Sequence, residues 1–367
     1  MTNLHTASRQ WASRPSEERF TSLTELHTAM AISRRRSRSG VVSNRNLSVI
    51  PTGDMVNEIA VAGPSGNAAH PTHWAFGQLC ARSGAPAGFL RTLPAPMVAD
   101  ILNYKNKFAG DPEDVGVLLS RTDENNGQGV ALRAVTGPNY GRIFNAEVSG
   151  VLVQRFGDGV TGQWKVPGEF GREIVVTKEN TTIYGSDRDM FVFLADEHNR
   201  IEVPNRRNGQ AGSLARGFFV WNSEVGAATV GIAFFLFDYV CCNRIVWGAD
   251  QYIEKRIRHT ASAPDRWLEA CLPALENYSE ASSAPIVSMI EAAQAHKLDD
   301  VKAFLAKRFT PGLAKEIAAA YESDEGKPIE TLFDVVTGLT AHARTVPYQS
   351  ERVDLERQAG DLLDLAA

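Results

Sequence analysis

The sequence predicts an α+β protein, with a mainly antiparallel sheet core, helices on one face of it, and an all-helical C-terminal part. Strand-like apolar runs are concentrated between residues 115 and 262, and polar, glycine-bearing turns join them as in antiparallel hairpins. Apolar residues at helical spacing dominate residues 263–367. The chain has 367 residues, 43% of them hydrophobic, which is enough to bury a large core.

Residues 1–62 are predicted to form an N-terminal arm with one helix near 22–31 and a short strand near 47–51. The only dense basic run in this arm consists of Arg34, Arg35, Arg36 and Arg38. Because arginine binds phosphate groups in a bidentate manner, this run is a candidate nucleic-acid contact. The alternative interpretation is a solvated arm, or a strand edge that charge protects from aggregation.

Residues 63–114 are predicted to be a helical segment. Thr72 is placed to cap a helix over 73–83, and a further helix is expected over 96–107. Helices joined by a turn allow a helix-turn-helix interpretation. The would-be recognition helix after Pro86 is short and apolar and has only Arg91 as a basic residue, so packing is the preferred role.

Residues 115–262 are expected to form an α+β core, in which residues 115–260 make one mainly antiparallel sheet. Its predicted elements are strands over 115–121 and 129–135, a helix over 143–156, and strands over 174–177, 181–184 and 190–194. The principal hairpin spans Gly217 to Phe237, and its second run, from Val230, is apolar on both strand faces. A strand that is buried on both faces belongs in the middle of a sheet, so we expect this hairpin to be central.

The principal hairpin has a signature that extends beyond secondary structure. Asn222, Ser223 and Gly226, followed by an apolar strand and Val240-Cys241-Cys242-Asn243, resemble the core of the domain-of-unknown-function 932 group, also called phage/plasmid-like proteins. Leu132-Arg133-Ala134-Val135 and Arg258-His259-Thr260 fit the same group in order. The resemblance implies a mobile genetic element, such as a phage, prophage or plasmid, in a bacterial host cell. The cytoplasmic location is expected from the residues, because no apolar run is of membrane-spanning length and the N-terminus is polar and arginine-bearing. It implies no defined chemistry.

The signature gathers residues with special roles at the ends of buried strands, namely Asn222, Ser223, Glu224, Gly226, Cys242 and Asn243. Buried polar groups are hydrogen-bonded or used, so an architectural role is preferred over a ligand or nucleic-acid contact. A catalytic site is the third interpretation. It would need a neighbouring base, for which only His259 is available, and no catalytic residue is assigned.

A second basic cluster precedes the helical C-terminal region. At helical spacing Lys255, Arg258 and His259 share one face, which makes them a second candidate phosphate contact. The charge is unevenly distributed, because residues 261–367 contain 10 Lys+Arg and 18 Asp+Glu, a net charge of −8, whereas the remainder carries +3. The basic segments therefore stand out against an acidic chain.

Several classes of site are not predicted. The sequence has no phosphate loop, dinucleotide fingerprint or nucleophile elbow, so no cofactor is expected. His70 and His73 lack further ligands nearby, and the cysteines Cys80, Cys241, Cys242 and Cys271 lack metal-type spacing, so we expect no metal and interpret the thiols as buried and free. Asp187 and Asp189 are interpreted as part of a turn. No apolar run is long enough to span a membrane, and no membrane partner is expected.

These features together predict a non-enzymatic protein that binds nucleic acid as an accessory of replication or recombination, for example in handling single strands. Single- or double-stranded DNA is the expected partner. One alternative is a protein-interaction or inhibitor protein, which the acidic helical C-terminal region would suit. The other is an enzyme with its site at Asn222, Ser223, Glu224, Cys242 and Asn243. The oligomeric state is left open.

Overall fold

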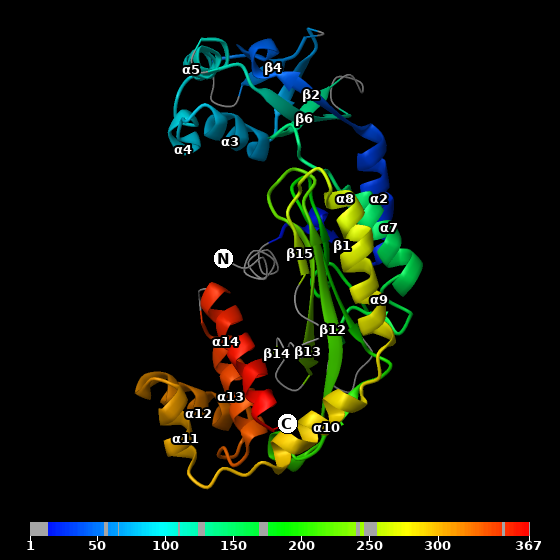
Figure 1. Cartoon of the computed structure of the whole chain (residues 1–367), viewed down its shortest axis with the longest axis vertical. Coiled ribbons are helices and arrows are strands. Elements are labelled where there is room, and N and C mark those ends of the chain that lie inside the picture. Colours follow the sequence, from blue (N-terminus) through cyan, green and yellow to red (C-terminus); the bar gives the residue numbers. More distant parts are fainter. Residues whose placement is uncertain are drawn as a thin grey trace.

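The computed structural model describes residues 14–54, 58–64, 66–108, 111–123, 129–168, 175–239, 243–245, 255–346 and 349–366. These residues form an elongated, curved molecule with a small lobe at one end, a long sheet in the middle and a group of helices at the other end (Figure 1). The fold is α+β, as the sequence predicts.

The helices are α2 (Leu23–Arg36), α3 (His73–Arg82), α4 (Ala87–Leu90), α5 (Ala95–Lys107), α7 (Asn145–Phe156), α8 (Ala263–Arg266), α9 (Leu272–Glu280), α10 (Ala284–Ala295), α11 (Val301–Arg308), α12 (Pro311–Glu325), α13 (Leu332–Ala343) and α14 (Gln349–Leu363). A π-helical turn, Trp267–Cys271, joins α8 to α9. The strands of the small lobe are β2 (Ser37–Ser43), β3 (Ser48–Pro51), β4 (Ile59–Ala62), β5 (Ala68–Pro71), β6 (Asp114–Arg121) and β7 (Val130–Thr136). The strands of the long sheet are β1 (Arg19–Phe20), β8 (Trp164–Lys165), β9 (Ile183–Gly185), β10 (Met190–Asp196), β11 (Ile201–Val203), β12 (Gly212–Asn222), β13 (Val230–Asp238), β14 (Asn243–Ile245) and β15 (Lys255–Ile257).

The long sheet is built around the predicted hairpin of β12 and β13. Its strand order is β1-β9-β10-β12-β13-β14, with β8, β11 and β15 paired alongside, and its pairings are antiparallel. Phe234 and Phe235 are 3% and 1% exposed, so neighbouring residues of β13 are buried on opposite faces. The predicted central position of this hairpin is confirmed.

Two glycines of the hairpin make room for aromatic side chains on the facing strand. Gly217 pairs with Phe235, and Trp221 pairs with Gly231. A Cβ atom on Gly217 would lie 2.4 Å from the Phe235 ring, and one on Gly231 would lie 2.3 Å from the Trp221 ring. Glycine in a strand interior permits such close approach, so the absence of a side chain at both positions leaves room for the two rings.

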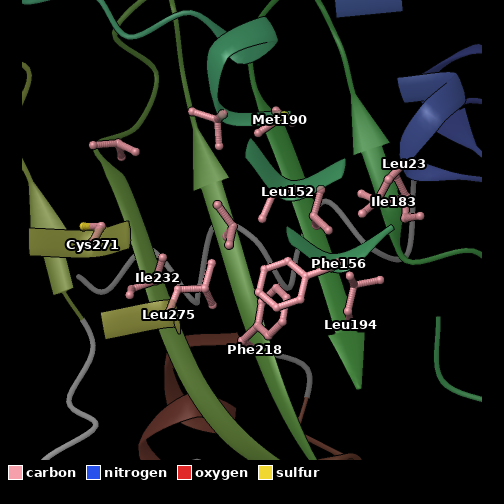
Figure 2. Close-up of a cluster of buried hydrophobic side chains, with 14 of the residues drawn as sticks. Leu23, Leu152, Phe156, Ile183, Met190, Leu194, Phe218, Ile232, Cys271 and Leu275 are labelled. Carbon is pink, nitrogen blue, oxygen red and sulfur yellow. The ribbon is translucent and has the colours of Figure 1, made fainter. Parts of the chain in front are cut away.

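The two faces of the long sheet carry different cores. On one face, α2, α7 and the α8–α9 segment cover aliphatic and aromatic residues of β10, β12 and β13, including Leu194, Phe218 and Ile232 (Figure 2). On the other face, a cluster rich in aromatic residues includes Phe193, Phe219 and Phe235, all of them buried. The alternation of Phe218 and Phe219 between the two cores follows from the period of two in a strand.

The small lobe contains the second sheet, with the strand order β2-β6-β7-β5-β4-β3 and a core completed by α3, α4 and α5. The prediction of a single sheet over residues 115–260 is therefore wrong, because β6 and β7 belong to the small lobe. The hairpin of β6 and β7 was predicted correctly. Its other neighbours, β2 and β5, are distant in sequence. Local periodicity predicts a strand and its nearest turn, but it does not predict non-local pairings of this kind.

The expected N-terminal arm is also corrected. Helix α2 continues to Arg36, and its Leu23 and Leu26 are fully buried against the long sheet. Strand β1 pairs with β9, and β2 pairs with β6. The described part of residues 1–62 is thus distributed between the two sheets, because the apolar side of α2 is needed to cover the central core.

The helical C-terminal region divides its packing between two cores. The α8–α9 segment covers the long sheet beside α7, whereas α10 to α14 enclose a separate core at the far end of the hairpin. That second core includes Leu214 of β12 and Leu236 of β13, so these helices pack on one another and on the sheet, as expected. In the described part of the predicted strand over 174–177, residues 175–177 are not in a strand, so that prediction is wrong.

Candidate functional site

The turn of the principal hairpin, residues 222–227, lies at the junction of the small lobe with the long sheet. Asn222, Ser223 and Glu224 are at most 1% exposed. Gly226 has a φ of 84°, in the left-handed region that glycine accepts without strain. Because these residues are enclosed, they are placed to hold the junction together and do not offer an open binding surface.

Asn222 and Ser223 bind backbone groups of three different segments. The Asn222 side-chain amide donates to the Ile143 carbonyl and to Asn145 Oδ1, each at 2.8 Å. Ser223 Oγ donates to the Arg188 carbonyl at 2.7 Å and accepts from the turn's own backbone at Val225 and Ala227. Both side chains thus satisfy polar groups that would otherwise be buried without partners.

Glu224 forms a buried ion pair with Arg133 of β7. Arg133 Nη1 lies 2.8 Å from Glu224 Oε2, and the two side chains are 6% and 2% exposed. Glu224 Oε1 also accepts from the backbone N–H of Asn145, at the start of α7. Arg133 extends the network by donating to the Asp187 carbonyl. One carboxylate therefore links the small sheet, the N-terminus of α7 and the hairpin turn.

Helix α3 holds the turn from the small-lobe side. Trp74 Nε1 and Gln78 Nε2 both donate to the Val225 carbonyl, at 3.0 and 2.7 Å. Gln78 Oε1 in turn accepts from the backbone N–H of Val135. This two-sided use of Gln78 fixes α3, β7 and the hairpin turn relative to one another.

The signature cluster proposed from the sequence does not come together. Asn243 pairs with Asp238 at the last residue of β13, whereas the turn precedes Val230 at the first residue. At about 3.4 Å per residue, these ends are roughly 27 Å apart. Cys242 lies outside the described residues. A site that combines the turn residues with Asn243 is therefore not formed, because the extended strand separates its two halves.

The second basic cluster is not helical. Residues 255–257 form β15, which pairs with the start of β13, so Lys255, Arg258 and His259 do not share a helix face. Lys255 Nζ donates to the Ala270 carbonyl at 3.3 Å, whereas Arg258 is exposed. These residues form a strand and not the expected helix, because the start of β13 offers backbone N–H and C=O groups for pairing on that side.

His259 is directed inward. Its ring stacks on Tyr140 with centroids 4.7 Å apart, and its Nδ1 lies 2.9 Å from the Gly141 carbonyl. Burial lowers the pKa of His259 below its ordinary value, and the nearby Arg142 charge acts in the same direction. The neutral imidazole is thus favoured, and the prediction that His259 lies on a phosphate-binding face is corrected.

The arginine run surrounds the end of α2. Arg34, Arg35 and Arg36 form its last turn, where cations favour the negative end of the helix dipole, and Arg38 follows in β2. Arg34 lies over the Phe144 ring, with Cζ 3.8 Å from the centroid. Arg35, Arg36 and Arg38 are exposed. Arg36 pairs with Asp123, and because both side chains are largely solvated, this ion pair contributes little to stability.

The structure brings the two basic segments to the same short stretch of chain. From the first segment, Arg34 packs on Phe144. From the second, the ring of His259, the residue after Arg258, packs on Tyr140, and the His259 carbonyl accepts a hydrogen bond from the Gly141 N–H. Residues 140 and 144 are at most about 14 Å apart along an extended chain. Segments that are more than 200 positions apart in the sequence thus converge on segment 140–144.

The sequence interpretation missed the residues that hold the junction. Arg133 had a recognisable signal, because a single charged residue within the apolar strand VALRAV indicates a buried ion pair. Trp74 and Gln78 had none beyond their place on a predicted helix. Arg142, which donates to the Glu224 carbonyl, also lacked a local signal. Its partner lies 82 positions away, and only the fold makes them neighbours.

Within the described ranges, no group of three or more His, Cys, Asp or Glu side chains is arranged to hold a metal ion. Cys80 and Cys271 are buried free thiols, whereas Cys241 and Cys242 lie outside those ranges. Asp187 and Asp189 lie in a turn before β10, where Asp189 is buried and paired with Arg14. In the part of the chain that the structure describes, no helix is both long and apolar enough to cross a membrane.

Comparison of the chain with protein-family models, with curated proteins and with solved structures found no match.

Proposed function

We propose that this protein binds nucleic acid through a basic junction surface formed by Arg35, Arg36, Arg38 and Arg258. The observation that carries the proposal is the convergence of two arginine-bearing segments on residues 140–144. Exposed arginines on neighbouring segments raise the local potential that attracts a phosphate backbone, within a Debye length of roughly 10 Å at about 0.1 M salt. Neutralising phosphates releases counterions, which supplies sequence-independent affinity.

The charge distribution also supports the proposal. Residues 261–367 carry a net charge of −8 and the remainder +3, so a polyanion is repelled from the helical end and attracted to the other. Arginine, which contacts phosphate through a planar fork, is the basic residue at all four positions. The role in replication or recombination of a mobile element rests on the resemblance of the hairpin signature alone.

A titration of single- and double-stranded DNA at several salt concentrations tests this function. The triple variant Arg35→Ala, Arg38→Ala, Arg258→Ala removes exposed cations and leaves Arg34, which packs on Phe144, in place. If all three contact phosphate, the slope of log K against log salt should flatten by about 2.7 for duplex DNA and about 2.1 for single strands.

The matched control removes three exposed cations from the acidic end, by the variant Lys302→Ala, Lys307→Ala, Arg308→Ala in α11. Its affinity and salt slope should equal those of the wild type. Absence of binding at low ionic strength, or equal loss in the two variants, would show that the basic junction surface does not bind nucleic acid.

A protein-interaction or inhibitor role is the second candidate. The observation that favours it is the acidic helical body of α10 to α14, which has its own core and a net negative charge. This role takes first place if the DNA titrations show no salt-dependent binding.

A further inference from the structure

A cavity of about 280 Å³ lies beside the hairpin turn, between the two lobes. His73 and Trp74 at the start of α3 form one wall, and residues 186–188 before β10 form another. Arg14, Pro15 and Glu18 complete the lining. Its volume is just below the range of about 300–1,000 Å³ for drug-sized ligands, which suits a single small group.

The walls of this cavity are held by the same turn that supports the basic junction surface. Trp74 Nε1 donates to the Val225 carbonyl, and Ser223 Oγ donates to the Arg188 carbonyl. On its other side, the turn accepts from Tyr140, whose hydroxyl donates to the Ser223 carbonyl at 2.8 Å. The hairpin turn thus contacts both segment 140–144 and the cavity wall, so a nucleic-acid strand bound at that segment would lie beside the turn that borders the cavity.

The lining combines a flat aromatic ring with polar groups of both signs. The Arg188 guanidinium carbon lies 6.0 Å from the centroid of the Trp74 ring, at the limit of a cation–π contact, and Arg188 is exposed. Glu18 and Asp187 supply carboxylate acceptors, and Ser186 a hydroxyl. Both lining arginines are paired with carboxylates, Arg14 with Glu18 and Asp189 and Arg188 with Asp189, so the cavity favours a neutral, planar ligand with both donors and acceptors over a phosphate group.

We propose that this cavity receives one unstacked nucleobase of a bound single strand, which stacks on Trp74 beside Arg188. The proposal rests on the proposed function and extends it, because it gives the protein a contact to bases in addition to phosphates. Carboxylates accept hydrogen bonds from exocyclic amino groups of bases, which here identifies Glu18 and Asp187 as the polar contacts. Stacking on an aromatic ring tolerates any base, so affinity should depend weakly on sequence.

The test compares an ordinary single-stranded DNA oligonucleotide with an abasic one of equal length. The two substitutions Trp74→Phe and Trp74→Leu both lose the bond to Val225, but only the first retains an aromatic ring. The wild type and Trp74→Phe should prefer the ordinary oligonucleotide, whereas Trp74→Leu should bind it about 5- to 150-fold more weakly, with unchanged affinity for the abasic strand.

Arg188→Ala supplies a second variant if Trp74→Leu unfolds, because the Arg188 side chain is solvated. It should reduce the preference for the ordinary strand severalfold. Arg308→Ala is its control, since Arg308 is exposed and lies 3.9 Å from the Phe304 ring centroid, far along the chain in α11. An unchanged preference in both Trp74→Leu and Arg188→Ala overturns the base cavity, while salt-dependent binding by the wild type keeps the proposed function.

If neither oligonucleotide binds, the proposed function fails, and free adenosine and cytidine test the cavity by itself. If a nucleoside quenches the tryptophan fluorescence of the wild type, and this quenching is lost in Trp74→Leu, the cavity binds a base without any contact to a phosphate backbone. No quenching by either nucleoside overturns the cavity as a base site.

Discussion

Replacing Glu224 by glutamine should destabilise the protein by a large fraction of its folding free energy. The substitution preserves the shape of the side chain and an oxygen that accepts from the Asn145 backbone N–H. It removes the charge that compensates Arg133, whose side chain is 6% exposed. Breaking a buried pair by removing one partner costs about 3–5 kcal/mol, against a typical total stability of about 5–15 kcal/mol.

A double-mutant cycle separates this effect from the loss of ordinary hydrogen bonds. Arg133→Met with Glu224→Gln removes both charges, so the double variant should be more stable than Glu224→Gln alone, because no uncompensated cation remains. Asp123→Asn is the matched control, since the Arg36–Asp123 pair is solvated and should contribute less than about 1 kcal/mol.

Urea unfolding followed by circular dichroism measures these differences, with a constant m-value as the check for two-state behaviour. A Glu224→Gln protein within about 1 kcal/mol of the wild type would refute the architectural role of this carboxylate. If that variant also lost DNA binding at unchanged stability, Glu224 would be part of a binding site. The interpretation that the hairpin turn only holds the small lobe and the long sheet together would then be wrong.

Two further predictions concern the central core and pH. Phe235→Ala should lower the free energy of unfolding by about 3–5 kcal/mol, because the ring is 1% exposed and Gly217 opposite it has no side chain to fill the space. A loss below about 1 kcal/mol, measured by urea unfolding, would contradict the burial of Phe235 in the central core. Burial lowers the pKa of His259 below 6.5 in the folded protein, so on acidification the unfolded chain takes up the proton first. The stability that the neutral, buried imidazole contributes above pH 6.5 is therefore lost as the pH falls through the folded pKa. Melting temperatures of the wild type and His259→Gln should therefore approach one another between about pH 7.5 and 5; curves that stay parallel would show that His259 is not buried in its neutral form.

Much of the fold could be predicted from local patterns. The run from Val230 is apolar on both strand faces, which predicts a strand buried on both sides, and the structure places its neighbouring Phe234 and Phe235 in different cores. Thr72 caps α3 as expected, since its hydroxyl accepts from the Ala75 N–H. These features depend on residues within a few positions of one another, so the sequence contains all that is needed to infer them.

The candidate site could be predicted only in part. The sequence identified Glu224 as a buried polar residue and the arginine run as a concentration of charge. It did not identify Arg133 as the partner of Glu224, and it wrongly grouped the turn with Asn243. A strand holds its two ends apart by its length, and only the folded chain shows which end each residue occupies.

The sequence by itself determined the central hairpin, the turn at Gly226 and the uneven charge of the chain, because these depend on side-chain type and short-range spacing. The tertiary structure decided that β6 and β7 leave the long sheet for the small lobe, that residues 255–257 pair as a strand, and that His259 turns inward. It also decided that both basic segments meet at residues 140–144. Each of these outcomes depends on which distant segments compete to cover the same apolar surface or to pair with the same strand edge, and local sequence does not encode the result of that competition.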